Sequence, residues 1–405
     1  MPSTPPPGDP VPSDGRLPEP ALAGLGRRPF GVYVHVPYCA TRCGYCDFNT
    51  YTAEELGPDA SRASYAASAV AEVRLARRVL GDVDLPVSTV FVGGGTPTLL
   101  PPADLVAVLD AVRAEFGLAP GAEVTTEANP DSVSPRSLAA LREGGFTRVS
   151  FGMQSASPAV LSVLERTHTP GRATVAVAEA RDAGFEQVSL DLIYGTPGET
   201  DTDWAESVGA AVAAGVDHMS AYALIVEPGT RLARRVERGE LPAPDDDVLA
   251  DRYLAADAQL AAAGLRWYEV SNWSRPGAEC RHNLGYWRGD DWWGIGPGAH
   301  SHVGGVRWWN VRHPAEYGRA LAAGRSPGEG REVLGAAERR TERVLLELRL
   351  RDGLPLEALD GAGRAAVDRA VSVGLLEVAA LAEGRAVLTL RGRLLADAVV
   401  RDLLG

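Results

Sequence analysis

Between residue 29 and about residue 235, short runs rich in β-branched residues alternate with longer amphipathic stretches. The short runs predict six strands, at residues 32–36, 89–92, 124–127, 148–151, 188–193 and 219–224. The longer stretches, for example 63–80, 103–116 and 174–183, have the periodicity of helices. Strands that alternate with helices predict a parallel sheet, and six such units predict an α/β fold that forms a partial (β/α)6 barrel. Ligands of such folds bind at the C-terminal ends of the strands.

Three segments lack this alternation. Residues 1–28 are rich in proline, and we expect them to be a disordered leader. Residues 236–326 are rich in Trp, His and Gly, which separates them from the barrel unit at 29–235. Residues 327–405 predict a helix near 337–350, two shorter helices to residue 373, a hairpin of 375–378 with 387–390, and a closing helix. This order resembles a winged-helix-like α+β domain.

Composition and charge exclude several classes of function. The chain has 405 residues, of which 45% are hydrophobic and 23% charged, and this is a globular composition. All 40 basic residues are arginine, so a Schiff-base lysine, a pyridoxal phosphate lysine and a Walker A lysine are excluded. No apolar run approaches 18 residues and no signal-peptide core is present, so we expect a cytoplasmic protein without a transmembrane segment.

The net charge of −13 makes nucleic acid an unexpected partner. Residues 327–405 contain 12 arginines against 13 acidic residues, so the winged-helix-like end has no basic stripe either. We interpret this end as a packing domain. The alternatives are that it covers the mouth of the barrel or docks a partner.

Three cysteines lie within eight positions directly after the first predicted strand: Cys39, Cys43 and Cys46. Thiolates hold zinc or iron–sulfur clusters. A structural zinc site needs a fourth ligand, but residue 48 is Phe and Cys280 is far away in sequence. Three thiolates on a four-iron cluster leave one iron open for a further ligand. A zinc knuckle or three unrelated cysteines are the alternatives.

The spacing Cys-x3-Cys-x2-Cys, with Tyr45 before the last cysteine, resembles the radical SAM superfamily. The resemblance implies a [4Fe–4S] cluster on Cys39, Cys43 and Cys46, whose open iron binds S-adenosyl-L-methionine (SAM). It also implies a flavodoxin- or ferredoxin-like electron donor of low potential.

The predicted strand ends carry further candidates for SAM binding. Gly94, Gly95 and Thr96 follow the second strand, where glycines allow a ligand to approach the backbone. The resemblance implies that this loop contacts the SAM amino group, and a flexible loop is the alternative. Glu127 and Asp191 end later strands, as does Gln154 in the strand between them. As an alternative, each of the three is simply part of a polar layer inside the barrel.

With Arg166 and Tyr33, this set is similar to the SAM pocket of the oxygen-independent coproporphyrinogen III oxidase family. The similarity implies that the acidic residues hold the ribose hydroxyls. It also implies that Gln154 and Arg166 flank the methionine moiety.

Seven of the eight tryptophans lie between residues 267 and 313. So much aromatic surface must form core, an interface or the wall of a pocket for a large flat ligand. Within this segment, the residues His282, Asn283, Tyr286 and Trp287 resemble the signature of the heme chaperone branch of the same oxidase family. The resemblance implies binding of heme and its transfer to an acceptor protein.

We hypothesise that His282 is an axial ligand of heme and that Tyr286 and Trp287 supply stacking surface. A thiolate or thioether from Cys280 is the alternative. The leading function is therefore a heme chaperone, and the second is a coproporphyrinogen oxidase. The oxidase pattern has a further cysteine where this chain has Phe48, and it has a longer structured N-terminal extension. A tryptophan-rich surface would also allow a heme- or cluster-dependent dimer.

Overall fold

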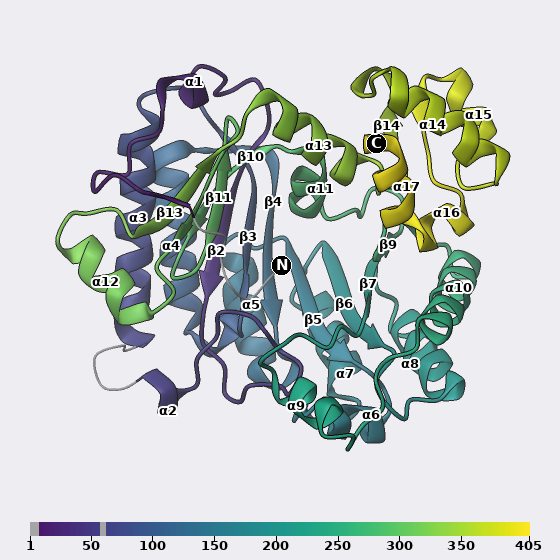
Figure 1. The fold of residues 1–405 in the computed structure, drawn as a ribbon. Coiled ribbons are helices and arrows are strands. Elements are labelled where there is room, and N and C mark those ends of the chain that lie inside the picture. Colours follow the sequence, from purple (N-terminus) through teal and green to yellow (C-terminus); the bar gives the residue numbers. More distant parts are fainter. Residues whose placement is uncertain (1–7, 57–61) are drawn as a thin grey trace.

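The structure is a computed structural model that describes residues 8–56 and 62–405. Within these residues, thirteen strands form one sheet in the order β1-β13-β12-β11-β10-β2-β3-β4-β5-β6-β7-β9-β8 (Figure 1). Its six central strands lie in chain order and pair in parallel. They are β2 (Phe30–Val36), β3 (Val87–Gly94), β4 (Leu118–Ala128), β5 (Arg148–Gln154), β6 (Gln187–Tyr194) and β7 (His218–Ala223). The prediction of a partial (β/α)6 barrel is confirmed.

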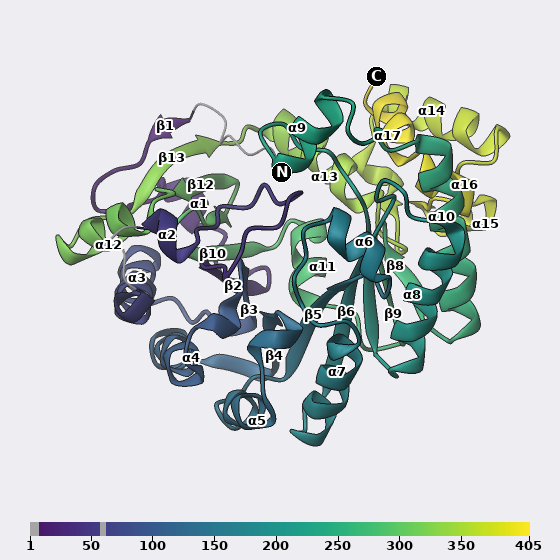
Figure 2. The same cartoon turned by 90° about the horizontal axis from the view of Figure 1, so that it is seen from below.

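Long helices connect these strands and cover the outer face of the sheet (Figure 2). They are α3 (Tyr65–Leu80), α4 (Pro102–Phe116), α5 (Pro135–Glu143), α7 (Arg172–Asp182) and α8 (Asp201–Ala213). Two of them begin with a reciprocal capping box, in which Ser134 pairs with Ser137 at α5 and Thr200 pairs with Asp203 at α8. The caps fix where each connecting loop ends, and so position the loops at the C-terminal ends of the strands.

Shorter helices follow the C-terminal ends of β2, β5 and β7. They are α2 (Ala53–Leu56), α6 (Pro158–Val163) and α9 (Arg231–Glu237), and single 3-10 turns lie at residues 62–64, 97–99, 130–132 and 356–358. Figure 1 shows these helices together at one end of the strands.

The segment 236–326 does not form one body, because its strands extend both edges of the barrel. At one edge, β9 (Asn272–Ser274) pairs with β7, and β8 (Arg266–Glu269) lies outside β9. At the other, β10 (Asp291–Ile295) pairs in parallel with β2, followed by β11 (His300–Val303) and β12 (Val306–Asn310). Helices α10 (Asp246–Ala262) and α12 (Pro314–Ala322) pack outside, on α8 and α3 respectively.

The expectation of a disordered leader differs from the structure over residues 8–28. Strand β1 (Asp9–Pro10) pairs with β13 (Gly328–Val333), and helix α1 (Glu19–Leu22) buries Ala21. Small residues permit this contact: a Cβ atom on Gly8 would lie 2.6 Å from the Trp309 ring. Proline limits the backbone conformations of a segment without preventing its packing as an edge strand. Residues 1–7 lie outside the described residues.

The C-terminal unit has its own hydrophobic core, made by buried residues from Val344 to Leu403. Its boundary lies later than residue 327, because β13 belongs to the large sheet. Its helices are α13 (Ala336–Glu347), α14 (Gly361–Ser372), α15 (Val378–Ala382), α16 (Leu390–Leu394) and α17 (Ala396–Leu404). The expected hairpin is reduced to one bridge between Leu376 and Leu388, with α15 between its arms. The small sheet instead pairs β14 (Leu354–Pro355) with β15 (Arg385–Ala386).

This unit packs on the side of the barrel where β8 and α10 lie. The Arg351 amide donates to the Tyr268 carbonyl at 2.9 Å, and Arg393 forms an ion pair with Asp257 at 2.9 Å. Figure 1 places the unit, in yellow, away from α2, α6 and α9.

Four of the seven clustered tryptophans are buried core residues: Trp273, Trp293, Trp308 and Trp309. For these four, the core explanation of the tryptophan-rich segment is therefore correct. Among the described residues, no helix is both long enough and apolar enough to cross a membrane.

Candidate functional site

A cavity of about 840 Å³ opens at the C-terminal ends of the parallel strands. It brings together all predicted site residues except Trp287. The predicted residues that line it are Tyr33, Cys39, Cys43, Tyr45, Cys46, Gly94, Gly95, Thr96, Glu127, Gln154, Arg166, Asp191, His282, Asn283 and Tyr286. Residues separated by up to about 250 positions in sequence thus share one site, which the C-terminal unit does not line among the described residues.

The loop that carries the three cysteines is tied to the barrel through Asn49. Its side chain donates to the Pro297 carbonyl at 3.0 Å and to the Arg312 carbonyl at 2.9 Å. Its own carbonyl oxygen lies 2.9 Å from Nε2 of His35 on β2. The cysteine loop is therefore held between the first strand and the inserted β10–β12 segment.

The three thiols on this loop are free. Burial raises the pKa of the Cys39 thiol and raises that of Cys46 to about 11. Ligation needs thiolates, so the bound group itself must supply positive charge. Among the described residues, no three His, Cys, Asp or Glu side chains are placed to hold a single metal ion.

Arg166 connects the cysteine loop to β5. Its Nη1 donates to Sγ of Cys43 at 3.6 Å, its Nη2 donates to the Gly152 carbonyl at 3.0 Å, and its Nε donates to Nδ1 of His168 at 3.3 Å. A partly buried guanidinium beside a sulfur atom suits a centre whose ligands are anionic. The prediction that Arg166 belongs to this site is consistent with its position.

The glycine loop packs so closely on the cysteine loop that side chains are excluded. A Cβ atom on Gly95 would lie 2.5 Å from the Tyr38 carbonyl oxygen and 2.9 Å from Sγ of Cys39. Gly94 has a φ of +112°, a conformation that favours glycine. The amides of Gly95 and Thr96 donate to carbonyls of residues 36 and 38. An ammonium group needs acceptors, so the carbonyl oxygens of this loop are the atoms that can serve a bound amino group.

Two carboxylates face the cavity from β4 and β6. Burial, followed by the charge of Asp191, raises the pKa of Glu127 to about 8, although the Gly94 amide donates to Glu127 at 2.9 Å. Burial also raises the pKa of Asp191, and Ser150 donates to Asp191 at 2.9 Å. Carboxyl groups that line a cavity and have raised pKa values are suited to bind a cation or hydroxyl groups.

Gln154 ends β5 in a conformation that is rare for a residue with a side chain, with a φ of +64°. The β5–β6 register shifts between Gly152 and Gln154, so the strand irregularity turns this side chain into the cavity. Such strained positions concentrate at functional sites. Tyr33 lines the same cavity from β2, with its hydroxyl oxygen 2.9 Å from Nδ1 of His35.

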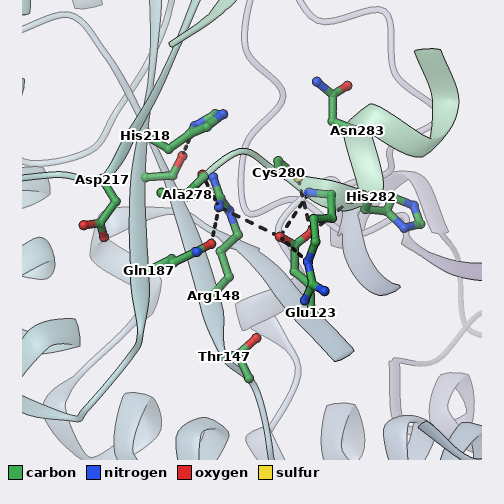
Figure 3. A network of polar contacts seen from close by, with 12 residues as sticks. Glu123, Thr147, Arg148, Gln187, Asp217, His218, Ala278, Cys280, His282 and Asn283 are labelled. Atoms are coloured by element: carbon green, nitrogen blue, oxygen red, sulfur yellow. Dashed lines mark hydrogen bonds and ion pairs between the residues drawn. The ribbon is translucent and has the colours of Figure 1, made fainter. Parts of the chain in front are cut away.

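Helix α11 (Arg281–Arg288) closes the inner end of the cavity, and Glu123 on β4 caps it. The amides of Arg281 and His282 donate to this carboxylate at 3.1 and 3.0 Å. Figure 3 shows Glu123 beside Arg148 of β5, which donates to Gln187 at 2.6 Å and to the Ala278 carbonyl at 2.9 Å. The helix is therefore anchored directly to the strands of the barrel.

Both ring nitrogens of His282 have partners. Nδ1 lies 2.8 Å from the Thr89 hydroxyl, and Nε2 lies 2.8 Å from the Tyr286 hydroxyl. Burial lowers the pKa of His282 to about 3, so the ring is neutral. Asn283 donates to Glu269 at 2.9 Å. Trp287 does not line the cavity.

Cys280 lies next to this helix as a buried thiol. Its Sγ donates to Glu123 at 3.6 Å, and burial together with that carboxylate raises its pKa to about 12. It is therefore protonated at neutral pH, which does not favour the thiolate alternative.

Two charged or titratable cavity residues that escaped the sequence analysis are Arg148 and His168. Arg148 lies on a predicted strand, where a charged side chain among apolar neighbours was the available signal. His168 lies in a loop and carried no such signal.

The chemistry of the residues present fits the implied groups. Three free thiols on one loop, an arginine beside them, a glycine cradle and two carboxylates that line the cavity suit a [4Fe–4S] cluster on Cys39, Cys43 and Cys46 with SAM beside it. When bound, such a pair supplies one-electron chemistry at a sulfonium carbon–sulfur bond.

Comparisons with known proteins agree with this geometry. Residues 33–211 match the model of the radical SAM superfamily. The chain is 59% identical over 387 residues to a Mycobacterium tuberculosis protein named heme chaperone HemW, covering 95% of this chain and 97% of that one. It is 32% identical over 385 residues to the Bacillus subtilis protein of the same name, covering 92% of this chain and 99% of that one.

Among solved structures, coproporphyrinogen III oxidase (HemN) from Escherichia coli matches with a TM-score of 0.81. The match covers 96% of this chain and 94% of that one at 21% identity, and at this identity it shows the fold alone. By its sequence relatives, the chain belongs to the radical SAM superfamily and, within it, to the family of proteins named heme chaperone HemW.

Proposed function

We propose that this protein is a heme chaperone, which binds heme and transfers it to an acceptor protein. A [4Fe–4S] cluster on Cys39, Cys43 and Cys46 and an exchangeable SAM would occupy the cavity. The observation that carries the proposal is the 59% identity to a protein named heme chaperone over nearly the whole of both chains. The cavity supports it, because the cysteine loop, the carboxylates and helix α11 line one space.

Within that space we propose that the α11 residues His282, Asn283 and Tyr286 contact the heme, with His282 as the axial ligand. A neutral imidazole is the form that binds iron, and the low pKa of His282 supports this. Iron at Nε2 must displace the Tyr286 hydroxyl, which lies 2.8 Å away. Trp287 does not line the cavity, so no contact with the heme is proposed for it.

The second candidate is an oxygen-independent coproporphyrinogen III oxidase, which would convert its substrate to protoporphyrinogen IX. The fold similarity to the Escherichia coli oxidase favours it. The side chain of Phe48, where the oxidase pattern has a further cysteine, argues for the chaperone. The two functions share cofactors and differ in product.

We further propose that reduction of the cluster uses a flavodoxin- or ferredoxin-like donor, and that the protein works in the cytoplasm. The three free, closely spaced thiols support a reducing compartment.

The test is anaerobic reconstitution with iron and sulfide, followed by heme titration and an optical spectrum. The same sample is then incubated with coproporphyrinogen III and SAM, and the porphyrins are separated by chromatography. A heme band that His282→Ala removes, with coproporphyrinogen intact, supports the chaperone. Conversion of coproporphyrinogen with consumption of SAM overturns it in favour of the oxidase.

A further inference from the structure

Three exposed hydrophobic side chains stand at the mouth of the cavity: Phe48, Tyr222 and Ile225. They are 60%, 45% and 66% exposed, and all three line the cavity. Phe48 lies on the cysteine loop, Tyr222 near the end of β7 and Ile225 just beyond it. Phe48 and Tyr222 are also the two aromatic residues among the large hydrophobic side chains that the described part of the chain exposes. Exposed apolar groups that gather at one opening indicate a binding surface.

The inner end of the cavity offers a different environment. His282 has both ring nitrogens engaged, and the carboxyl groups of Glu127 and Asp191 face the space. Deeper still, Glu123 and Arg148 form the polar network of Figure 3. An apolar ring buried against these groups would desolvate them. Within the described cavity, the exposed apolar surface therefore lies at the mouth.

The volume of the cavity also favours binding of a tetrapyrrole at the mouth. A cavity of about 840 Å³ falls within the range of roughly 300–1,000 Å³ that holds one drug-sized ligand. With a cluster and SAM inside, a tetrapyrrole must extend across the opening.

A second groove adjoins the mouth and supplies positive charge. Its volume is about 1240 Å³, and it shares Phe48 with the cavity. Arg42, Arg231 and Arg234 line it. Arg231 and Arg42 form ion pairs with Glu165 and Glu55, whereas Arg234 donates to the Gly229 carbonyl and joins no ion pair within the described residues. Arginine is the side chain best suited to pair with a ligand carboxylate.

We propose that Phe48, Tyr222 and Ile225 form the apolar face that receives the flat ring of heme at the cavity mouth, with Arg234 pairing with a heme carboxylate. This inference rests on the proposed heme binding and assigns its outer subsite. This placement is an alternative to axial ligation by His282, which lies at the inner end of the same cavity, and the His282→Ala and Ile225→Ser titrations decide between the two.

The test is heme titration of the reconstituted full chain with single variants at the mouth. Ile225→Ser and Phe48→Ser are each expected to weaken heme binding roughly 5- to 30-fold, because each removes a large apolar contact. Val175→Ser is the matched control: Val175 is 51% exposed on α7 and lines neither space. Iron content and SAM affinity, measured on every variant, report whether the cluster loop is intact. Ile225→Ser keeps the test decisive if Phe48→Ser disturbs Cys46.

Arg234 is tested with heme and with heme dimethyl ester, whose carboxylates are blocked. Arg234→Ala is expected to weaken binding of heme several-fold and to leave binding of the ester unchanged. If Arg234→Ala weakens binding of heme and of the ester equally, the proposed pairing of Arg234 with a heme carboxylate is overturned. If the native chain binds heme, but Ile225→Ser and Phe48→Ser bind it as Val175→Ser does, the apolar face is overturned. If the native chain binds no heme, it is the proposed function that fails.

Discussion

The hydroxyl of Tyr286 lies 2.8 Å from Nε2 of His282, one helical turn earlier on α11. Because Thr89 lies 2.8 Å from Nδ1, the ring is held at both nitrogens. If Nδ1–H donates to Thr89, Nε2 accepts from Tyr286 and presents the lone pair that a metal would use. Tyr286 and iron would then compete for one nitrogen.

This competition predicts the effect of Tyr286→Phe. Losing a hydrogen bond of about 0.5–1.5 kcal/mol removes the competitor, so heme binding should strengthen by roughly 2- to 10-fold. The measurement is heme titration followed by absorbance. Thr89→Val is the companion variant, expected to weaken binding because it no longer orients Nδ1. Unchanged spectra and affinities in both variants would show that His282 is not the iron ligand.

The raised pKa of Glu127 predicts that SAM binding depends on pH. Its pKa is raised to about 8 by burial and by Asp191, so the carboxyl is mostly protonated at pH 7 in the ligand-free protein. SAM carries a sulfonium and an ammonium group, and these cations favour the ionised form. Binding should therefore release a proton, and affinity should rise with pH by up to about tenfold per unit below pH 8.

Calorimetry at pH 6, 7 and 8, in buffers that differ in ionisation enthalpy, measures both quantities. Glu127→Gln should bind more weakly at pH 8 and lose the pH dependence, whereas the exposed Glu143→Gln should keep it. A native chain whose SAM affinity is flat between pH 6 and 8 would refute the link to Glu127.

Arg166 is expected to raise the reduction potential of the cluster. Its Nη1 donates to Sγ of Cys43 at 3.6 Å, and hydrogen bonds and positive charge at cluster sulfurs favour the reduced state. A charge-assisted hydrogen bond of about 1.5–3 kcal/mol corresponds to roughly 60–130 mV for one electron. Arg166→Met should lower the midpoint potential by that order, as measured by a titration followed by electron paramagnetic resonance. Arg136→Met, at an exposed position on α5, should leave it in place. If Arg166→Met and Arg136→Met have the same midpoint potential, Arg166 does not influence the potential of the cluster.

Sequence periodicity was sufficient for the barrel, because each central strand contains a mostly buried run of residues and is followed by a helix. Five of the six predicted strands lie within the observed ones, and the sixth ends one residue earlier at Ala223. The site was predictable for the same reason: Gln154 ends β5, Glu127 is next to the end of β4 and Asp191 lies in β6, and the C-terminal ends of parallel strands meet.

The remaining structure depends on partners far away in sequence. The order β10–β12 at one edge and β8–β9 at the other cannot be read from composition, because tryptophans suit a core strand at either edge. Residues 8–28 became ordered because Gly8 fits against Trp309 and β1 finds an open edge at β13. Proline content alone carries no information on such a docking site.

Glu72 on α3 holds the inserted segment that contains β10–β12. This buried carboxylate on α3 accepts from the Gly296 amide at 2.7 Å, from Asn310 at 2.7 Å and from the Tyr317 hydroxyl at 2.6 Å. Both of its oxygens receive donors. In Glu72→Gln the new amide would point its N–H groups at one of these donors, leaving polar groups unsatisfied at a cost of about 1–3 kcal/mol.

The destabilisation caused by Glu72→Gln should be larger at low pH than at high pH. Burial raises the pKa of Glu72 in the folded protein to about 7, above its ordinary value of 4.5, so folding favours the protonated form. The native chain therefore loses stability as pH rises from about 4.5 to 7. The stability of Glu72→Gln lacks this dependence on pH. Thermal unfolding should show a larger deficit for Glu72→Gln at pH 5 than at pH 8, and Glu316→Gln, an exposed change on α12, should match the native chain at both. A deficit that grows with pH would mean that the three donors hold Glu72 ionised, and that its charge stabilises the junction of α3 with β10–β12.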